Sequence, residues 1–156
     1  MYEGGARIMT NSLIEKFFGV DLWLVGIGHF IALCASFQVP FRLGWKEDLV
    51  KLRPFNRKLL WVQSTFTVLT IIAFGSFTLA LHKEFLQGDR AAIGLSLFIG
   101  IFWAFRVGVD AFYFSHKDWP QGKQFVVGHI LLTSLFVSFA ISYLGLFCWQ
   151  MLKTKL

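Results

Sequence analysis

The sequence predicts an all-α integral membrane protein, folded as an antiparallel bundle of four membrane-spanning helices. Of its 156 residues, 56% are hydrophobic and only 15% are charged, which is less charge than a soluble domain carries. Four apolar runs each reach the roughly 20 residues that a helix needs to cross the hydrocarbon core. The connections between these runs are short, so consecutive helices are expected to lie antiparallel in one domain.

The predicted spans cover about residues 18–38, 59–81, 92–114 and 125–150 of a single domain, residues 1–156. Residues 1–17 are interpreted as an interfacial N-terminal segment that forms a short helix, with Leu13, Ile14, Phe17 and Phe18 on its apolar side. No small-residue cleavage site follows this segment, and the first apolar run is long enough to span. We therefore expect the first helix to be retained rather than removed as a signal peptide.

The connection at residues 39–58 is the most basic part of the chain. Pro54 prevents one continuous helix through it, and Asn56 is suited to cap the second span. Four side chains are expected at the level of the lipid headgroups: Lys51, Arg53, Arg57 and Lys58. Snorkelling toward the interface is the main interpretation, and a site for anionic headgroups is the alternative. Membrane lipids are the expected partners and nucleic acid is not, because lipid covers most of the surface.

Basic residues are distributed unequally between the two sides of the predicted bundle. Eight flank the side of the first and third connections, and six flank the side of the termini. By the positive-inside rule, the first and third connections lie in the cytoplasm and both termini lie outside it.

The third span contains the stretch "FWAFRVGVDAFYF" (residues 102–114), in which two charged residues interrupt an apolar run. An arginine or aspartate at the centre of a spanning helix costs roughly 2.5–3.5 kcal/mol on insertion scales. Arg106 and Asp110 are four residues apart, so they share a helix face and can pair, and Tyr113 lies on that face too.

The other three spans each carry a polar residue at a similar predicted depth. His29, Gln63 and His129 are expected, like Arg106 and Asp110, within roughly 6–15 Å of one membrane face, by the rise of a helix. A candidate polar pocket therefore comprises His29, Gln63, Arg106, Asp110, Tyr113 and His129. Two alternatives remain open: the charged pair only ties helices together, or it contacts another subunit.

His29 and His129 also permit a sharper hypothesis, because two histidines on facing helices can ligate a b-type haem, with Arg106 near a propionate. No other metal site is predicted, and no known catalytic motif is present. Three functions stay open. The first is an accessory or structural membrane component, alone, as a homo-oligomer or in a larger complex. The second is haem-based electron transfer. The third is a small intramembrane enzyme or a lipid- or quinone-binding protein.

Small residues recur every four positions in the third span, at Ser96, Gly100, Ala104 and Gly108, which predicts close packing against another helix. The two cysteines, Cys34 and Cys148, fall near opposite membrane faces. A disulfide between them is excluded by that separation, and both are expected to be buried small apolar residues.

Residues 52–77 contain "RPFNRK", a following tryptophan and "TVLTIIAFG", and "FWAFRVGVDAFYF" follows in the third span. These pieces resemble an uncharacterised family of small four-helix bacterial membrane proteins, found mostly in planctomycete- and verrucomicrobia-like genomes. The resemblance implies the four-span architecture and a bacterial inner membrane, and it implies no activity.

Overall fold

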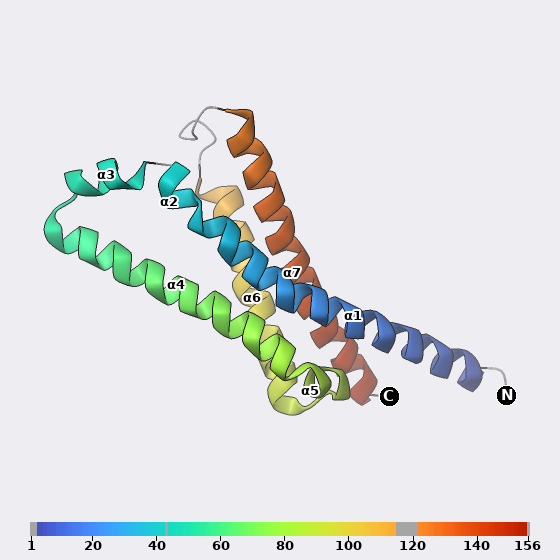
Figure 1. The fold of residues 1–156 in the computed structure, drawn as a ribbon. Coiled ribbons are helices and arrows are strands. Elements are labelled where there is room, and N and C mark those ends of the chain that lie inside the picture. The colour runs from blue at the N-terminus through green and yellow to red at the C-terminus, as the bar shows by residue number, and fades with distance from the viewer. Residues whose placement is uncertain (1–2, 43, 115–121, 156) are drawn as a thin grey trace.

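The computed structural model describes residues 3–42, 44–114 and 122–155, and within them the chain forms four long helices and three short ones (Figure 1). The long helices are α1 (Glu3–Phe37), α4 (Pro54–Ala80), α6 (Arg90–Phe112) and α7 (Lys123–Lys155). The short helices are α2 (Val39–Arg42), α3 (Trp45–Lys51) and α5 (His82–Gln87). Each long helix contains a segment long and apolar enough to cross a membrane, so the predicted all-α bundle of four spanning helices is confirmed.

The N-terminal segment does not form a separate interfacial helix. From Glu3 onward it continues without a break into the first spanning helix, and no proline interrupts it. Phe18 is buried against the core, and Ile14 packs beside it, whereas Phe17 faces outward. The beginning of α1 projects past the C-terminal end of α7 (Figure 1).

The corner between α3 and α4 is set by proline. Pro54 is the first residue of α4, where its fixed φ and missing N–H suit the start of a helix. Arg53 precedes it without a side-chain cap, and Asn56 lies inside the helix. The predicted capping role of Asn56 is therefore wrong, because the helix begins two residues earlier.

The opposite end of the bundle, around α5, is closed by local hydrogen bonds. Gly88 ends α5 at φ 79°, a left-handed conformation that glycine adopts without strain. The Asp89 carboxylate then accepts from the Ala91 backbone N–H at 2.9 Å and so caps α6. From α7, the Gln150 amide donates to the Phe85 carbonyl at 2.8 Å. This end of the molecule is consequently well ordered by polar contacts as well as by packing.

Contacts between the long helices follow the order α4, α1, α7, α6. Two apolar clusters fill the space between them. The larger contains Val25, Ala32, Leu33, Ile71, Phe74, Ile99, Trp103, Phe136, Phe139, Ala140 and Tyr143. The smaller, beside α5, contains Phe18, Leu22, Phe85, Ala92, Leu146 and Trp149. Close approach of α1 and α4 depends on Gly75, where an added Cβ would lie 3.0 Å from the His29 Cβ and 3.1 Å from the Gly26 carbonyl oxygen.

The predicted small-residue stripe of α6 packs against another helix over only half its length. Ser96 is fully buried, and a Cβ at Gly100 would lie 3.1 Å from the Leu144 backbone nitrogen of α7. Ala104 is exposed, and Gly108 has nothing within 4 Å of its Cβ position. Residues four apart differ by about 40° around a helix. The stripe therefore rotates by about 120° over twelve residues and leaves the interface.

The other half of the bundle is open. No residue is buried in three segments: 54–70 of α4, 104–112 of α6 and 123–135 of α7. Figure 1 shows the N-terminal half of α4 diverging from the other helices toward α3. We call the region between residues 54–70 of α4 and residues 104–112 of α6 the lateral opening.

Both cysteines are free, in agreement with the prediction that they do not pair. However, Cys34 and Cys148 are exposed, so the prediction that they are buried is wrong. They lie on helix faces that point away from the two apolar clusters.

Two glycines of α6 allow a matched test of the packing. Gly100→Leu should destabilise the protein by about 1–3 kcal/mol, the usual cost of overpacking, because the new side chain meets the α7 backbone. Gly108→Leu makes the same chemical change in open space and should leave stability nearly unchanged. Thermal unfolding in mild detergent measures both, and equal losses would contradict this account of the α6–α7 contact.

Candidate functional site

Four polar side chains meet between α6 and α7 in the open half of the bundle, and we call them the polar quartet: Arg106, Asp110, His129 and Thr133. Asp110 is at its centre. The Thr133 hydroxyl donates to the Asp110 Oδ2 at 2.9 Å, and the His129 Nε2 lies 3.1 Å from the same oxygen. An Nε2–H tautomer of His129 donates to the carboxylate in this arrangement. The Asp110 side chain is only 12% exposed, and both of these partners come from α7.

Arg106 is the least satisfied member of the quartet. Its Nη1 lies 3.7 Å from the Asp110 Oδ1, an ion pair too long to be a hydrogen bond. Nη1 is buried and has no hydrogen-bond partner among the described residues. The guanidinium also lies over the Phe136 ring, 5.5 Å from its centroid. The side chain as a whole is 41% exposed, so part of it can be reached by a molecule outside the chain.

His29 is separate from the quartet and belongs to the aromatic core. It is fully buried, and its ring stacks on Phe139 with centroids 4.2 Å apart and planes inclined by 7°. The Nδ1 donates to the Val25 carbonyl oxygen at 2.6 Å, and the Trp103 Nε1 donates to the His29 Nε2 at 3.0 Å. Both ring nitrogens are thus engaged, and the bond from Trp103 joins α1 to α6.

The haem hypothesis does not fit this arrangement. A haem ligand needs a free lone pair, and the Nε2 lone pair of His29 already accepts from Trp103. His29 contacts α7 at Phe139, ten residues beyond His129 and therefore about 15 Å further along the helix. The sequence predicted similar depths for the two histidines because residues were counted from one common membrane face. That count requires helices that run side by side, whereas α1 crosses α7.

Gln63 and Tyr113 are also outside the quartet. Gln63 is exposed on the diverging half of α4, and no hydrogen bond to its side chain is found in the described part of the chain. Phe74 lies eleven residues later and about 20° around the helix, and it contacts Phe98 and Phe102 of α6. Gln63 therefore faces the lateral opening from the α4 side.

Tyr113 follows the last residue of α6 and is 80% exposed, where it contacts Phe114 edge-on. It belongs to an open hollow of about 470 Å³ on α6 that is lined by Ala104, Phe105, Gly108, Val109, Phe112 and Tyr113. The half of the small-residue stripe that leaves the α7 interface thus lines this hollow.

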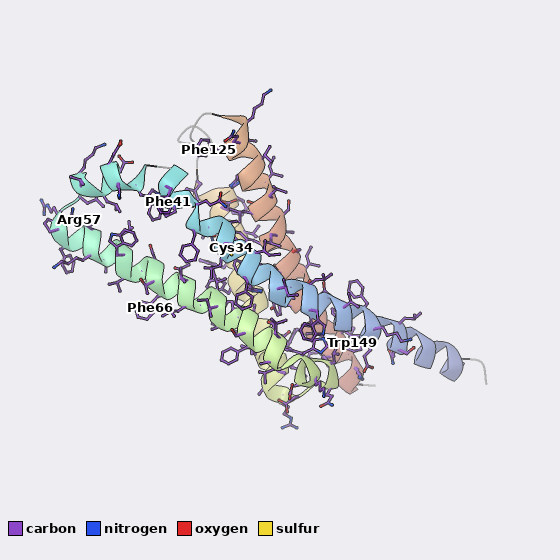
Figure 2. All side chains as sticks on the ribbon, in the orientation of Figure 1. Cys34, Phe41, Arg57, Phe66, Phe125 and Trp149 are labelled. Carbon is purple, nitrogen blue, oxygen red and sulfur yellow. The ribbon has the colours of Figure 1, made fainter. Side chains whose placement is uncertain are left out.

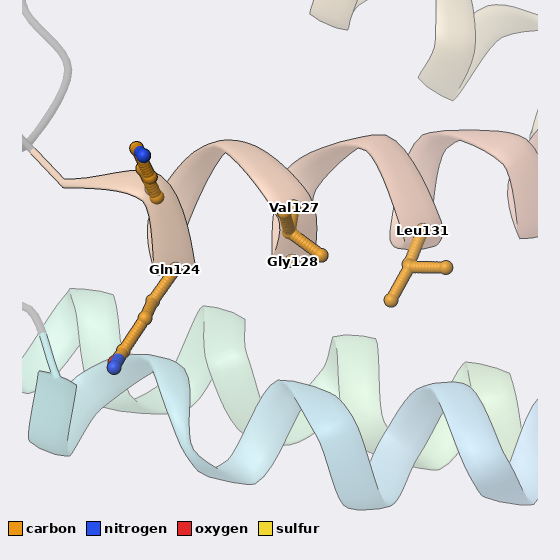
Figure 3. A pocket seen from close by; sticks show the side chains of 5 residues that line it. Gln124, Val127, Gly128 and Leu131 are labelled. Carbon is orange, nitrogen blue, oxygen red and sulfur yellow. The ribbon is translucent and has the colours of Figure 1, made fainter.

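A second open hollow, of about 490 Å³, lies on the first turns of α7 and is lined by Lys123, Gln124, Val127, Gly128 and Leu131 (Figure 3). In Figure 3 the Gln124, Val127 and Leu131 side chains point toward the neighbouring helices. Neither of these two hollows is lined by a member of the polar quartet.

The four predicted headgroup residues gather at the corner between α3 and α4, where Arg57 is labelled in Figure 2. Lys51 donates to the Asp48 carboxylate at 2.9 Å, and both side chains are largely exposed. Arg53 and Lys58 are exposed, and Arg57 is partly exposed. The corner therefore presents several basic groups on one side of the bundle.

Sequence reasoning missed several polar residues inside the bundle. Tyr143 is fully buried, its hydroxyl is hydrogen-bonded to Thr78 of α4, and its backbone carbonyl accepts from Ser96 of α6 at 2.8 Å. Asp21 of α1 is partly exposed, meets Ser142 of α7, and has a buried Oδ2 without a partner in the described residues. A carboxylate near the start of the predicted span 18–38 was the available signal for Asp21.

Comparison of the chain with protein families, curated proteins and solved structures gives no match. The resemblance to the four-helix bacterial family stays a prediction.

The quartet predicts an asymmetry between its two charged members. Asp110→Leu strands Arg106 and removes the acceptor of His129 and Thr133, so it should cost about 1–3 kcal/mol, the usual penalty for polar groups left without their partner. Arg106→Leu leaves Asp110 with two partners and should cost clearly less. Arg106→Leu/Asp110→Leu should be milder than Asp110→Leu alone. Unfolding in mild detergent measures all three, and equal single losses would show that the long ion pair is the main restraint.

Proposed function

We propose that this chain is a small accessory component of a membrane, in which the lateral opening binds an amphipathic, lipid-like molecule whose acceptor oxygen is held by Arg106. The observation that carries the proposal is the guanidinium itself. It lies about 9 Å inside the end of α6, its side chain is 41% exposed, and the described residues give its Nη1 no hydrogen bond.

A guanidinium at this depth needs an acceptor, because lipid tails supply none. Snorkelling relieves an arginine near a helix end only when the side chain reaches the nearer interface. Side chains lean toward the N-terminus of their helix, and Arg106 lies near the C-terminus of α6. Its position over Phe136, three residues beyond Thr133 on α7, agrees with this inward direction. An oxygen of a bound molecule would satisfy the donors there.

The surroundings of Arg106 suit an amphipathic occupant. Phe136 of α7 lies beneath the guanidinium, and Phe66 on α4 and Phe105 on α6, at 65% and 73% exposed, add apolar surface elsewhere on the open half of the bundle. Gln63 offers an amide on the α4 side of the opening. A phospholipid and a quinone share the needed chemistry, which is an oxygen acceptor attached to an apolar body.

The basic corner of α3 and α4 supports an association with anionic lipids at the membrane surface. Its lysines and arginines lie on the same side of the bundle as the lateral opening (Figures 1 and 2). Each basic side chain near an anionic surface contributes about 1 kcal/mol of attraction. The corner would thus enrich anionic lipids near the opening, but it would not form a specific binding site for one lipid molecule.

The proposed binding can be tested by native mass spectrometry of protein purified in mild detergent. Wild-type protein should retain a bound molecule of lipid mass, and Arg106→Leu should lose it while Arg106→Lys keeps part of it. Arg90→Leu, which removes an exposed arginine from the other end of the same helix, is the control and should retain the molecule. Solvent extraction followed by mass analysis identifies a phospholipid or a quinone. Equal retention by wild type and Arg106→Leu would refute the proposal, as would an empty wild-type protein.

We also propose a bacterial inner membrane, on the basis of the family resemblance, with both termini outside the cytoplasm. The N-terminal end of α1 and the C-terminal end of α7 lie at the same end of the bundle, opposite the basic corner (Figure 1). The excess of basic residues at that corner favours its placement in the cytoplasm. A periplasmic reporter enzyme fused after Leu156 should be active and a cytoplasmic reporter inactive. The reverse pattern would invert the orientation.

A further inference from the structure

The polar quartet has no excess of positive charge when His129 is neutral. The Asp110 Oδ1 lies 3.7 Å from the Arg106 Nη1, and the Asp110 side chain is only 12% exposed, so water screens it poorly. His129 in the Nε2–H tautomer that donates to Asp110 adds a hydrogen bond but no charge. One cation and one carboxylate therefore balance each other before any ligand arrives.

The spanning segments supply no further cation for a ligand. Arg106 is the only lysine or arginine in the four predicted spans, which are residues 18–38, 59–81, 92–114 and 125–150. Sites that recognise a phosphate group usually gather several basic side chains around it. A phosphate at Arg106 would instead meet a single guanidinium that Asp110 already neutralises.

An anionic and an uncharged acceptor would therefore bind at Arg106 with different affinities. An anion loses its hydration when it enters the apolar surroundings of the guanidinium, and the Asp110 carboxylate repels it. Phe136, whose ring centroid lies 5.5 Å from the Arg106 Cζ, adds no polar group that could offset this loss. A carbonyl oxygen is less costly to remove from water, and a charged donor still gives it a strong hydrogen bond.

Building on the proposed function, we infer that the acceptor held by Arg106 is an uncharged carbonyl oxygen, and that Asp110 excludes an anionic phosphate from the site. The ligand is then a neutral lipid. A quinone supplies the oxygen as a ketone, and a diacylglycerol supplies it as an ester. Asp110 determines specificity in addition to holding α6 to Thr133 and His129 of α7.

Three soluble ligands separate these acceptors: dioctanoylglycerol, dioctanoyl phosphatidate and a decyl-substituted benzoquinone. The first two differ only in the phosphate group. Their affinities are measured by calorimetric titration of the full chain in nonionic detergent, with roughly 0.5 M salt to screen the exposed basic corner. The diacylglycerol or the quinone should bind about tenfold more tightly than the phosphatidate, and the tighter of the two identifies the source of the carbonyl. Equal or tighter binding of the phosphatidate would overturn the inference.

A change at Asp110 tests the cause of the preference. Asp110→Asn removes the charge and keeps a side chain of similar size that can hydrogen-bond to α7. It should raise the affinity for the phosphatidate about tenfold and leave the affinity for the diacylglycerol nearly unchanged. Asp48→Asn removes an exposed carboxylate from α3 and is the control, which should change neither affinity. An unaltered preference in Asp110→Asn would show that Asp110 does not exclude phosphate. The comparison of ligands on the wild-type protein decides the inference even where Asp110→Asn does not fold.

Arg106→Leu distinguishes a failure of this inference from a failure of the proposed function. Phosphatidate binding that is tighter than that of the other two ligands and is lost in Arg106→Leu would refute the uncharged acceptor alone, because lipid binding at Arg106 would stand. Binding of every ligand that is unaffected by Arg106→Leu would refute both, as would no binding to the wild-type protein.

Discussion

The close contact of α6 with α7 is the interaction on which the rest of the structure depends. Gly100 lets the α7 backbone approach, and the Ser96 hydroxyl donates to the Tyr143 carbonyl one turn away. Hydroxyl-to-carbonyl bonds of this kind join spanning helices because lipid offers no alternative partner. The contact positions Tyr143 to reach Thr78 of α4. It also sets the separation at which Asp110 meets two side chains of α7 further along.

The bundle is consequently unequal along its length. Near α5 the helices are joined by side-chain bonds, aromatic packing and the Gln150 amide. Toward α3 the same helices separate, and four hydroxyls of α4 bond back to carbonyls of their own helix: Ser64, Thr65, Thr67 and Thr70. Such bonds satisfy the hydroxyls without a neighbouring helix. The diverging half of α4 can therefore stand alone in lipid, with Gln63 as its conspicuous polar exception.

The sequence was sufficient for the helices and for part of the site. Apolar run length predicted the four spans, and the four-residue spacing predicted that Arg106 and Asp110 share a face. His29 and Gln63 were placed in the same pocket by counting residues from a membrane face. That count assumes that the helix axes are aligned and that their ends lie at the same membrane level. Here α4 diverges from the other helices, and α1 crosses α7. Likewise, the four-residue spacing from Ser96 to Gly108 suggests a single contact surface. In a straight helix, however, the second half of this stripe is rotated away from α7. Asp21 could have been noticed from its apolar flanks, whereas its single partner depends on how α1 lies on α7.

The pairing of helices has a consequence for how the chain is made. Its most extensive contacts join α1 with α4 and α6 with α7, which are consecutive in the order of synthesis. Each pair can therefore enter the bilayer as a preassembled hairpin while translation continues, and helices inserted in this way associate afterwards. The bonds from Trp103 to His29 and between Tyr143 and Thr78 then join the second hairpin to the first. Both bonds are lost if the hairpins dock in the wrong register, so they stabilise the native register relative to the alternatives.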